Sequence, residues 1–224
     1  MLNHIATVAS TRVVPTPPPS IFFGLDERNS LPGVAMRFAR NTEVYGEGEP
    51  AEYFYQVISG AVRAYKILDD GRRQIRAFYL PGDIFGLEAG EEYASSADAI
   101  IDSQISVIKR SSVMARIDQD RSVARQLWSL TSQELARVQN RALLLVKSAE
   151  ERVAGFLLEM ARRTAATTMV QLPMSRQDIA DYLGLTIETV SRTLTQFEHS
   201  ALIALPSSRR IELRNRAALN RLNS

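Results

Sequence analysis

The stretch SRQDIADYLGLTIETVSRTLTQFEHSAL, residues 175–202, decides the fold of the C-terminal part of the chain. Ser175 and Asp178 have the spacing of a helix N-cap with a capping box, and Gly184 ends the short helix that they begin. Thr186 is placed to cap a second helix, whose apolar residues recur at helical spacing. These residues are Ile187, Val190, Leu194 and Phe197. Two helices joined by a short turn that contains glycine predict a helix-turn-helix, in which the second helix enters the major groove of DNA.

The outward face of the second helix carries side chains suited to reading bases. Glu188, Ser191 and Arg192 lie at positions i, i+3 and i+4, so they share one face near the helix start. Glutamate accepts from cytosine N4, arginine pairs with O6 and N7 of guanine, and serine bonds to several bases, each good pair being worth about 1–3 kcal/mol. A second interpretation stays open, in which Glu188 and Arg192 form an ordinary surface ion pair worth about 0.3–0.5 kcal/mol.

The residues after the second helix predict a wing. Residues 202–205 and 210–213 are short runs separated by the turn sequence Pro206-Ser207-Ser208-Arg209. The sequence therefore predicts a winged helix-turn-helix over residues 148–224. Its predicted base contacts are Ile187, Glu188, Ser191 and Arg192, and its predicted phosphate contacts are Ser175, Arg176, Gln177, Thr186, Thr189, Ser207, Ser208 and Arg209.

The motif TIETVSR at residues 186–192, with RQDIA at 176–180 before it, resembles the DNA-binding motif of the cyclic AMP receptor protein/FNR family of bacterial regulators. Glu-x-x-Ser-Arg is the variant of the FNR and FixK branches, whereas an arginine usually precedes the glutamate in the cyclic AMP branch and Ile187 stands there here. The resemblance implies a homodimeric transcription activator of the FixK type that binds palindromes with TTGA-type half-sites. It also implies RNA polymerase as a partner and genes of low-oxygen respiration or nitrogen metabolism, nitrogen fixation included, as targets.

Composition bounds the function further. Of 224 residues, 45% are hydrophobic and 23% charged, which is typical of a globular protein, and no apolar run approaches the roughly 18 residues of a membrane span. We expect a cytoplasmic protein without membrane contact. Cysteine is absent, which excludes disulfides and a cysteine-ligated iron–sulfur cluster, and the two histidines, His4 and His199, lack evident metal-binding partners. We predict no metal, no cofactor and no catalytic residues, and therefore no enzyme.

The N-terminal half changes from a tail to short strands. Residues 1–32 are rich in proline and predict a flexible tail. Between residues 33 and 110, apolar runs at 53–58, 61–68 and 74–80 end at turn signals, which predicts an antiparallel β-sandwich or barrel. The order of glycines and turns resembles the β-roll sensor domain of the same family. The expected fold class is thus α+β, with an N-terminal, jelly-roll-like antiparallel β-roll, a long helix and a C-terminal winged helix-turn-helix.

The predicted β-roll lacks a residue that the cyclic AMP branch needs. There, an arginine about ten residues after a Gly-Glu-Leu segment meets the cyclic phosphate, and the corresponding run here, residues 86–97, has none. We expect a vestigial sensor that works without cyclic nucleotide. The acidic loop at 88–92 is either a protein-binding surface or a plain solvated loop. The main alternative function is a regulator gated by an unidentified small molecule in the β-roll.

Residues 111–147 have the periodicity of one long helix. Its apolar stripe follows steps of four and three residues, as in a coiled coil, with Trp128 and Leu130 at the flanks. Packing on the β-roll is one interpretation of this stripe, and the family resemblance favours pairing of two subunits. The predicted dimer contacts are Leu127, Thr131, Leu135, Val138, Ala142 and Leu145.

Overall fold

The computed structural model describes residues 33–144 and 146–223. The predicted tail over residues 1–32 and the predicted dimer contact Leu145 lie outside the described residues. Among those that are described, no helix is both long and apolar enough to cross a bilayer.

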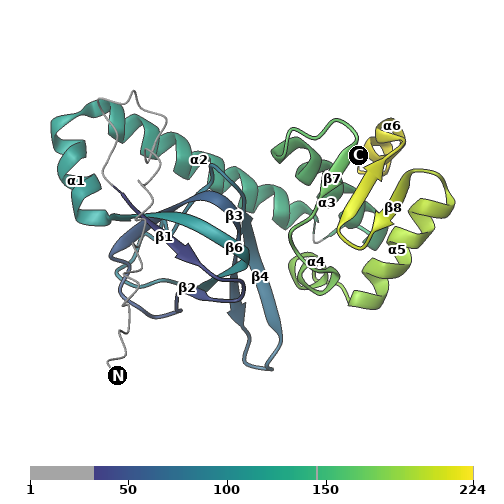
Figure 1. Ribbon diagram of the computed structural model, residues 1–224, viewed down its shortest axis with the longest axis horizontal. Helices are drawn as coiled ribbons and strands as arrows, with labels where there is room; N and C mark the ends of the chain where they lie inside the picture. Colours follow the sequence, from purple (N-terminus) through teal and green to yellow (C-terminus); the bar gives the residue numbers. More distant parts are fainter. Residues whose placement is uncertain (1–32, 145, 224) are drawn as a thin grey trace, which may run out of the picture.

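The N-terminal domain is the antiparallel β-roll that the sequence predicts. Its strands are hydrogen-bonded in the order β1-β6-β3-β4, while β2 pairs with β6 and β5 with β3. Figure 1 shows this roll on one side of the molecule and the C-terminal domain on the other. The strand bounds are β1 Val34–Phe38, β2 Glu43–Tyr45, β3 Tyr53–Ile67, β4 Arg73–Tyr79, β5 Ile84–Phe85 and β6 Ser96–Lys109.

Strand β3 is longer than predicted, because Gly60 bends it and does not end it. The pairing of β3 with β6 shifts register between Val57 and Val62, which is the mark of β-bulges. Gly60 has φ 92°, and a Cβ on it would lie 2.2 Å from Oγ of Ser103. Only glycine fits a backbone that turns this sharply against a neighbouring strand. The 15-residue β3 therefore pairs with β5 before Gly60 and with β4 after it.

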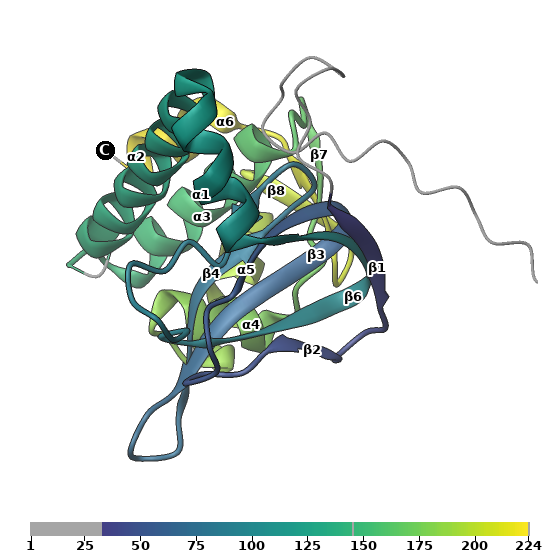
Figure 2. The ribbon, with the colours of Figure 1, turned by 90° about the vertical axis from the view of Figure 1, so that its left-hand side faces the viewer.

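The predicted helix over residues 111–147 is two helices, α1 (Arg110–Gln119) and α2 (Arg121–Leu144). Asp120 separates them with an extended backbone, φ −139° and ψ 104°. Its carboxylate accepts a hydrogen bond from the Ser122 amide at 2.8 Å, so a local side-chain bond starts a new helix and ends the earlier one. Figure 2 shows α1 and α2 along one side of the roll, and α2 continues toward the C-terminal domain.

The C-terminal domain is a winged helix-turn-helix with two elements more than predicted. Its first helix begins after Ser148, whose side chain forms a capping box with Glu151 at the predicted domain boundary. The wing is a three-stranded sheet in the order β7-β9-β8, and a last helix, α6, follows it. The bounds are α3 Ala149–Arg163, β7 Met169–Gln171, α4 Arg176–Leu183, α5 Ile187–His199, β8 Ile203–Ser207, β9 Arg210–Leu213 and α6 Arg216–Leu222.

A single apolar core joins the two domains. Ile75 and Phe78 of β4 belong to the same buried cluster as Phe156 of α3 and Tyr182 of α4. The ring centroids of Phe78 and Tyr182 are 5.0 Å apart, and those of Phe78 and Phe156 are 6.2 Å apart. Helix α4 is thereby packed against the edge of the β-roll.

Candidate nucleic-acid interface

The helix-turn-helix forms through the local signals in its sequence. Ser175 caps α4 by accepting from the amide of Asp178 at 3.1 Å, and its own amide donates to Oδ2 of Asp178 at 2.9 Å. Gly184 ends α4 with φ 65°, the left-handed conformation that glycine adopts without strain. Thr186 then caps α5 by accepting from the amide of Thr189 at 3.2 Å. The predicted motif is confirmed in both caps and in the turn.

Helix α5 separates an apolar inner face from a polar outer face. Val190, Leu194 and Phe197 are buried against the rest of the domain. Glu188 and Arg192 are exposed, while Ser191 and Ile187 are half-buried. The four predicted base contacts thus lie in the first half of α5, and two of them present their charges to solvent. This arrangement suits direct readout in a major groove.

The predicted phosphate contacts lie at the starts of α4 and α5 and at the tip of the wing. Arg176 begins α4 half-buried, and its buried Nε has no hydrogen-bond partner among the described residues. Gln177 is exposed and donates to Oδ1 of Asp181 at 2.6 Å. Ser207 ends β8 and is exposed, as is Ser208 beside it, whereas Arg209 is half-buried. The remaining predicted contacts, Ser175, Thr186 and Thr189, are half-buried or exposed at the two helix starts.

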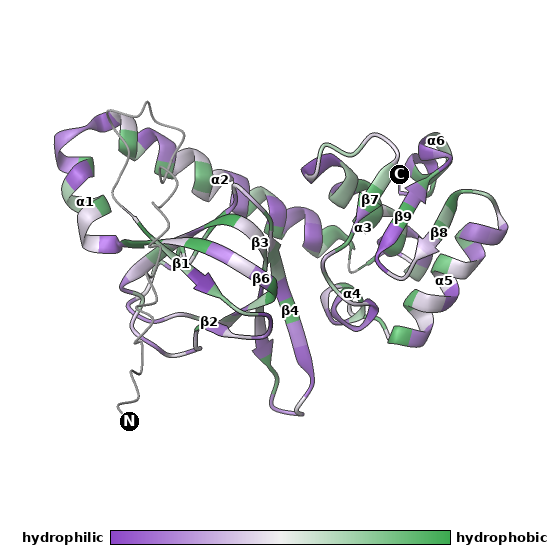
Figure 3. Ribbon diagram, in the orientation of Figure 1, coloured by the Kyte–Doolittle hydropathy of each residue, from purple (hydrophilic) through white to green (hydrophobic). Residues whose placement is uncertain are grey.

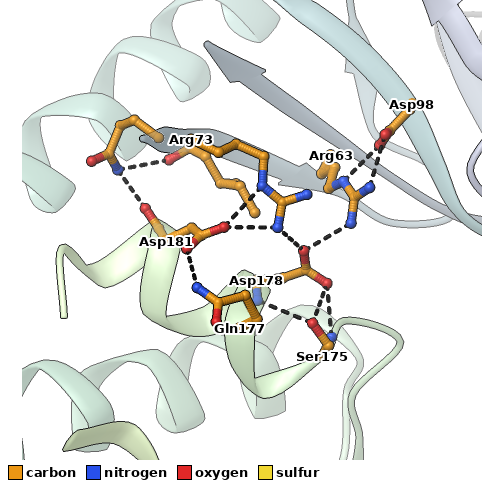
Figure 4. Close-up of polar contacts among 9 residues, drawn as sticks. Arg63, Arg73, Asp98, Ser175, Gln177, Asp178 and Asp181 are labelled. Carbon is orange, nitrogen blue, oxygen red and sulfur yellow. Dashed lines mark hydrogen bonds and ion pairs between the residues drawn. The ribbon is translucent and has the colours of Figure 1, made fainter. Parts of the chain in front are cut away.

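The structure adds a charged cluster that the sequence did not predict. It consists of Arg63 and Asp98 of the roll, Arg73 at the start of β4, and Asp178 and Asp181 of α4 (Figure 4). Oδ1 of Asp178 accepts hydrogen bonds from Nη1 of Arg63 at 2.8 Å and from Nη2 of Arg73 at 2.7 Å. Its other oxygen closes the capping box of α4. We call these five residues the docking cluster.

The environment of Asp178 favours its ionised form. Burial alone would raise the pKa of this carboxyl group. Hydrogen bonds from the hydroxyl and amide of Ser175, together with the charges of Arg63 and Arg73, outweigh burial and lower the pKa below its ordinary value. The Asp178 carboxylate is therefore a stable anion on which two guanidinium groups from the β-roll converge.

A cavity of about 210 Å³ lies between the β-roll and α2. No arginine lies in residues 86–97, yet Arg76 of β4 and Arg141 of α2 line the cavity together with Glu88 and Glu134. Both arginines donate to main-chain carbonyls, Arg76 to Ala94 at 3.3 Å and Arg141 to Ile75 at 2.5 Å. The family motif covers one loop and therefore did not indicate these arginines, whereas the cavity is lined by β2, β3, β4, β5 and α2 as well as by that loop.

The exposed apolar stripe of α2 differs at one end from the predicted stripe. Leu127 is half-buried and packs against the core of the roll that contains Phe54 and Ile84, so it is not on the exposed stripe. Trp128, 75% exposed, takes its place. The stripe continues through Thr131, Leu135, Val138 and Ala142, all of which are exposed. Figure 3 shows apolar and polar positions alternating along α2.

Known proteins resemble the chain over both domains. The family model described as a Crp-like helix-turn-helix domain matches residues 151–222, and the one described as a cyclic nucleotide-binding domain matches residues 35–120. The nitrogen fixation regulation protein FixK of Azorhizobium caulinodans is 54% identical over 86% of this chain and 80% of its own length. The transcriptional activatory protein AadR of Rhodopseudomonas palustris is 42% identical over 76% of this chain and 73% of its own.

A solved structure agrees with the sequence relatives. The structure of FixK2 from Bradyrhizobium japonicum superimposes with a TM-score of 0.84 at 52% identity, covering 87% of this chain and 98% of that one. The helix-turn-helix geometry, the β-roll and these similarities converge on one family. The chain belongs to the cyclic AMP receptor protein/FNR family of transcription regulators, in its FixK branch.

Proposed function

We propose that the protein is a homodimeric activator that reads palindromic operators with TTGA-type half-sites through α5. The observation that carries this proposal is the outer face of α5, where Glu188 and Arg192 are exposed and Ser191 lies between them. An arginine and a glutamate one helical turn apart match a guanine and a nearby cytosine in a major groove. Arg176, at the start of α4, and the wing residues Ser207, Ser208 and Arg209 contact phosphates on either side.

Dimerisation through α2 supports binding to a palindrome. The stripe at Trp128, Leu135 and Val138 exposes large apolar side chains, at 75%, 58% and 57% respectively. Contiguous exposed apolar surface of this kind on a helix marks a protein interface. Two copies related by a two-fold axis would present two recognition helices to one face of the duplex, about 34–36 Å apart.

The relatives supply the biological setting of the proposal. The names of those similar over most of the chain refer to nitrogen fixation regulation and transcriptional activation. We propose that this protein likewise activates genes of nitrogen fixation or low-oxygen metabolism, in the cytoplasm, by contacting RNA polymerase. It acts as a binding protein, without catalytic chemistry and without a cyclic nucleotide or iron–sulfur cofactor.

Selection of bound sequences from random DNA tests the proposed function. The purified dimer should enrich a palindrome with TTGA-type half-sites whose centres are one helical turn apart. Glu188→Ala is expected to change the enriched bases while the spacing of the half-sites stays the same, because it alters readout and leaves dimer geometry alone. Enrichment of an unrelated or asymmetric sequence by the wild-type protein would contradict the proposal.

A second function has one observation in its favour. The cavity beside α2 is lined by two arginines and two glutamates, and Val138 of the exposed stripe lines it too. A small molecule bound there would touch the proposed dimer helix directly. Isothermal calorimetry, and mass spectrometry of ligand carried through purification, separate this ligand-gated regulator from one that is active by itself.

A further inference from the structure

The docking cluster joins the two domains at the point where α4 begins. Its ion pairs are short: Arg63 to Asp98 and Arg63 to Asp178 at 2.7 and 2.8 Å, and Arg73 to Asp178 and to Asp181 at 2.7 Å each. The side chains of Arg63 and Asp178 are only 12% and 3% exposed. Charges this deeply buried are tolerated only when their partners are in place, so the cluster holds α4 in one position.

The cluster continues from the β-roll to the surface proposed to face DNA. Nε of Arg73 donates to Oδ2 of Asp181 at 2.8 Å, and Oδ1 of the same carboxylate accepts from Gln177 at 2.6 Å. The neighbouring Gln74 donates to the carbonyl of Asp181 at 2.6 Å. Figure 4 shows Arg73, Asp181 and Gln177 in sequence across the domain boundary. Gln177, a proposed phosphate contact, is thus oriented through Asp181 by Arg73 of the other domain.

The position of α4 also fixes that of α5. Ile179 and Leu183 of α4 share a buried cluster with Val190 and Leu194 of α5, and Leu185 packs against it in the turn. The two helices therefore move together. Any rotation of α4 against the roll would swing the outer face of α5 relative to α2, and hence relative to a second subunit.

No residue that the structure describes covers the recognition face in the docked arrangement. Glu188 and Arg192 are exposed while all five residues of the docking cluster are engaged. An autoinhibitory contact would cover that face or draw its charges into pairs. The geometry instead indicates that the docking cluster holds α5 in a position in which its outer face is accessible to DNA.

We propose that Arg63 and Arg73 of the β-roll are positioning residues for DNA binding. Through Asp178 and Asp181 they set the separation and angle of the two recognition helices in the dimer, in the absence of a ligand. The inference rests on the proposed function and adds to it the means by which a regulator without effector holds its DNA-binding geometry.

The test uses full-length Arg73→Ala, with Arg72→Ala as the matched control. Arg72 lies next to Arg73 and lines the same cleft beside α4, but its guanidinium binds Asp70 of its own hairpin, 2.7 Å away, and forms no ion pair with a described residue of α4. Binding is measured on the selected palindrome and on two versions with the half-sites one base pair closer or farther apart. Each added base pair rotates a half-site by about 35° around the duplex. Dimer mass and melting temperature are measured in parallel.

Wild-type protein and Arg72→Ala should bind the original spacing tightly and discriminate against the altered ones. Arg73→Ala should bind the original spacing about tenfold more weakly and discriminate less, because part of the gain from linking two rigidly placed helices is lost. Arg73→Lys, which keeps the charge, should retain an intermediate preference. If Arg73→Ala is poorly folded, Asp181→Asn supplies the same readout from the winged-helix side.

Spacing is the decisive readout, since a general loss of stability would weaken binding to all three duplexes alike. Equal affinity and equal spacing preference of Arg73→Ala and wild-type protein would overturn the inference. So would tighter binding by Arg73→Ala, which would mean that the docking cluster restrains α5. If selection by the wild-type protein enriches no palindrome, the proposed function fails and this inference fails with it.

Discussion

Glu188 and Arg192 lie four residues apart on the outer side of α5, and within the part of the chain that the structure describes no ion pair joins them. The interpretation of this face as an ordinary surface salt bridge therefore loses its support. Both charges remain available to base edges. We propose that the two side chains serve DNA binding and contribute little to folding.

Arg192→Ala should cost about 1–3 kcal/mol of binding free energy and relax the preference at the guanine of each half-site. Arg176→Ala should weaken binding to all sequences alike and lower the slope of log K against log salt by about one unit, as loss of a phosphate contact does. Fluorescence anisotropy with matched and mismatched duplexes over a salt series measures both. An Arg192 variant with unchanged sequence preference would refute direct readout.

Val138→Asp should convert the dimer to monomers. The change places two carboxylates near the two-fold axis in an otherwise apolar seam, where like charges are poorly solvated and repel. The interpretation of Val138 as a core residue of one subunit conflicts with its 57% exposure, so the monomer should keep its fold. Operator binding should fall strongly, because a monomer occupies only one half-site.

Light scattering coupled to gel filtration measures the mass of the Val138 variant. Gln133→Asp is the control, since Gln133 is exposed on α2 away from the stripe. Trp128, the chain's only tryptophan, provides a second readout, with emission shifting to longer wavelength if dissociation exposes it. A Val138→Asp protein with the mass of a dimer would show that α2 is not the dimer helix.

Cyclic AMP at millimolar concentration should leave the melting temperature unchanged. Glu88 and Glu134 line the cavity of the β-roll, and Arg76 and Arg141 already donate to main-chain carbonyls, so an anionic ligand finds an unfavourable site. Operator DNA is the positive control, because a ligand that binds the folded state raises the melting temperature by mass action. Operator binding should also be equal in air and under nitrogen. A clear shift with cyclic AMP would reverse the vestigial-sensor interpretation.

Asp178 should make the protein sensitive to acid. Its pKa is lowered in the folded state, so its contribution to stability is complete above the ordinary carboxyl pKa of about 3.9. That contribution is lost as the pH falls through the lower folded-state value. Asp178→Asn should reduce the free energy of unfolding at pH 7 by about 3 kcal/mol and flatten its decline below about pH 4.

Urea titrations of wild-type and Asp178→Asn protein at several pH values measure this difference. Asp69→Asn, at an exposed position of the β3–β4 hairpin, serves as the control and should follow the wild-type profile. Parallel acid profiles for wild-type and Asp178→Asn protein would show that the docking cluster is not a carboxylate-dependent contact.

Local signals account for most of what could be predicted from the sequence. The capping residues Ser175 and Thr186 and the left-handed Gly184 act within a few residues of themselves, so the helix-turn-helix could be placed to within a residue. The break at Asp120 is local too, and the Asp120–Ser122 spacing was a usable cap signal that the strong helical periodicity on both sides obscured. Strand β7 is three residues long, which is too short for a pattern.

The docking cluster could not be predicted, because its partners are far apart in the chain. Arg63 and Asp178 are separated by 115 residues, and Arg73 and Asp181 by 108. The role of Asp178 as a capping residue already explained its presence, so there was no reason in the sequence to predict an ion pair for its carboxylate. Only the packing of α4 on β4 shows that one carboxylate serves both purposes.

The apolar core shared by the two domains couples their stabilities. Ile75 and Phe78 from one domain and Phe156 and Tyr182 from the other lose their apolar packing together if the domains separate, and the ion pairs of Asp178 are lost with them. We therefore expect loss of the C-terminal domain's fold to destabilise the β-roll as well, although the roll keeps two apolar clusters of its own. We also expect a substitution in this part of the β-roll to alter the position of the recognition helix through the shared core and the ion pairs of Asp178, even if the substituted residue lies far from DNA.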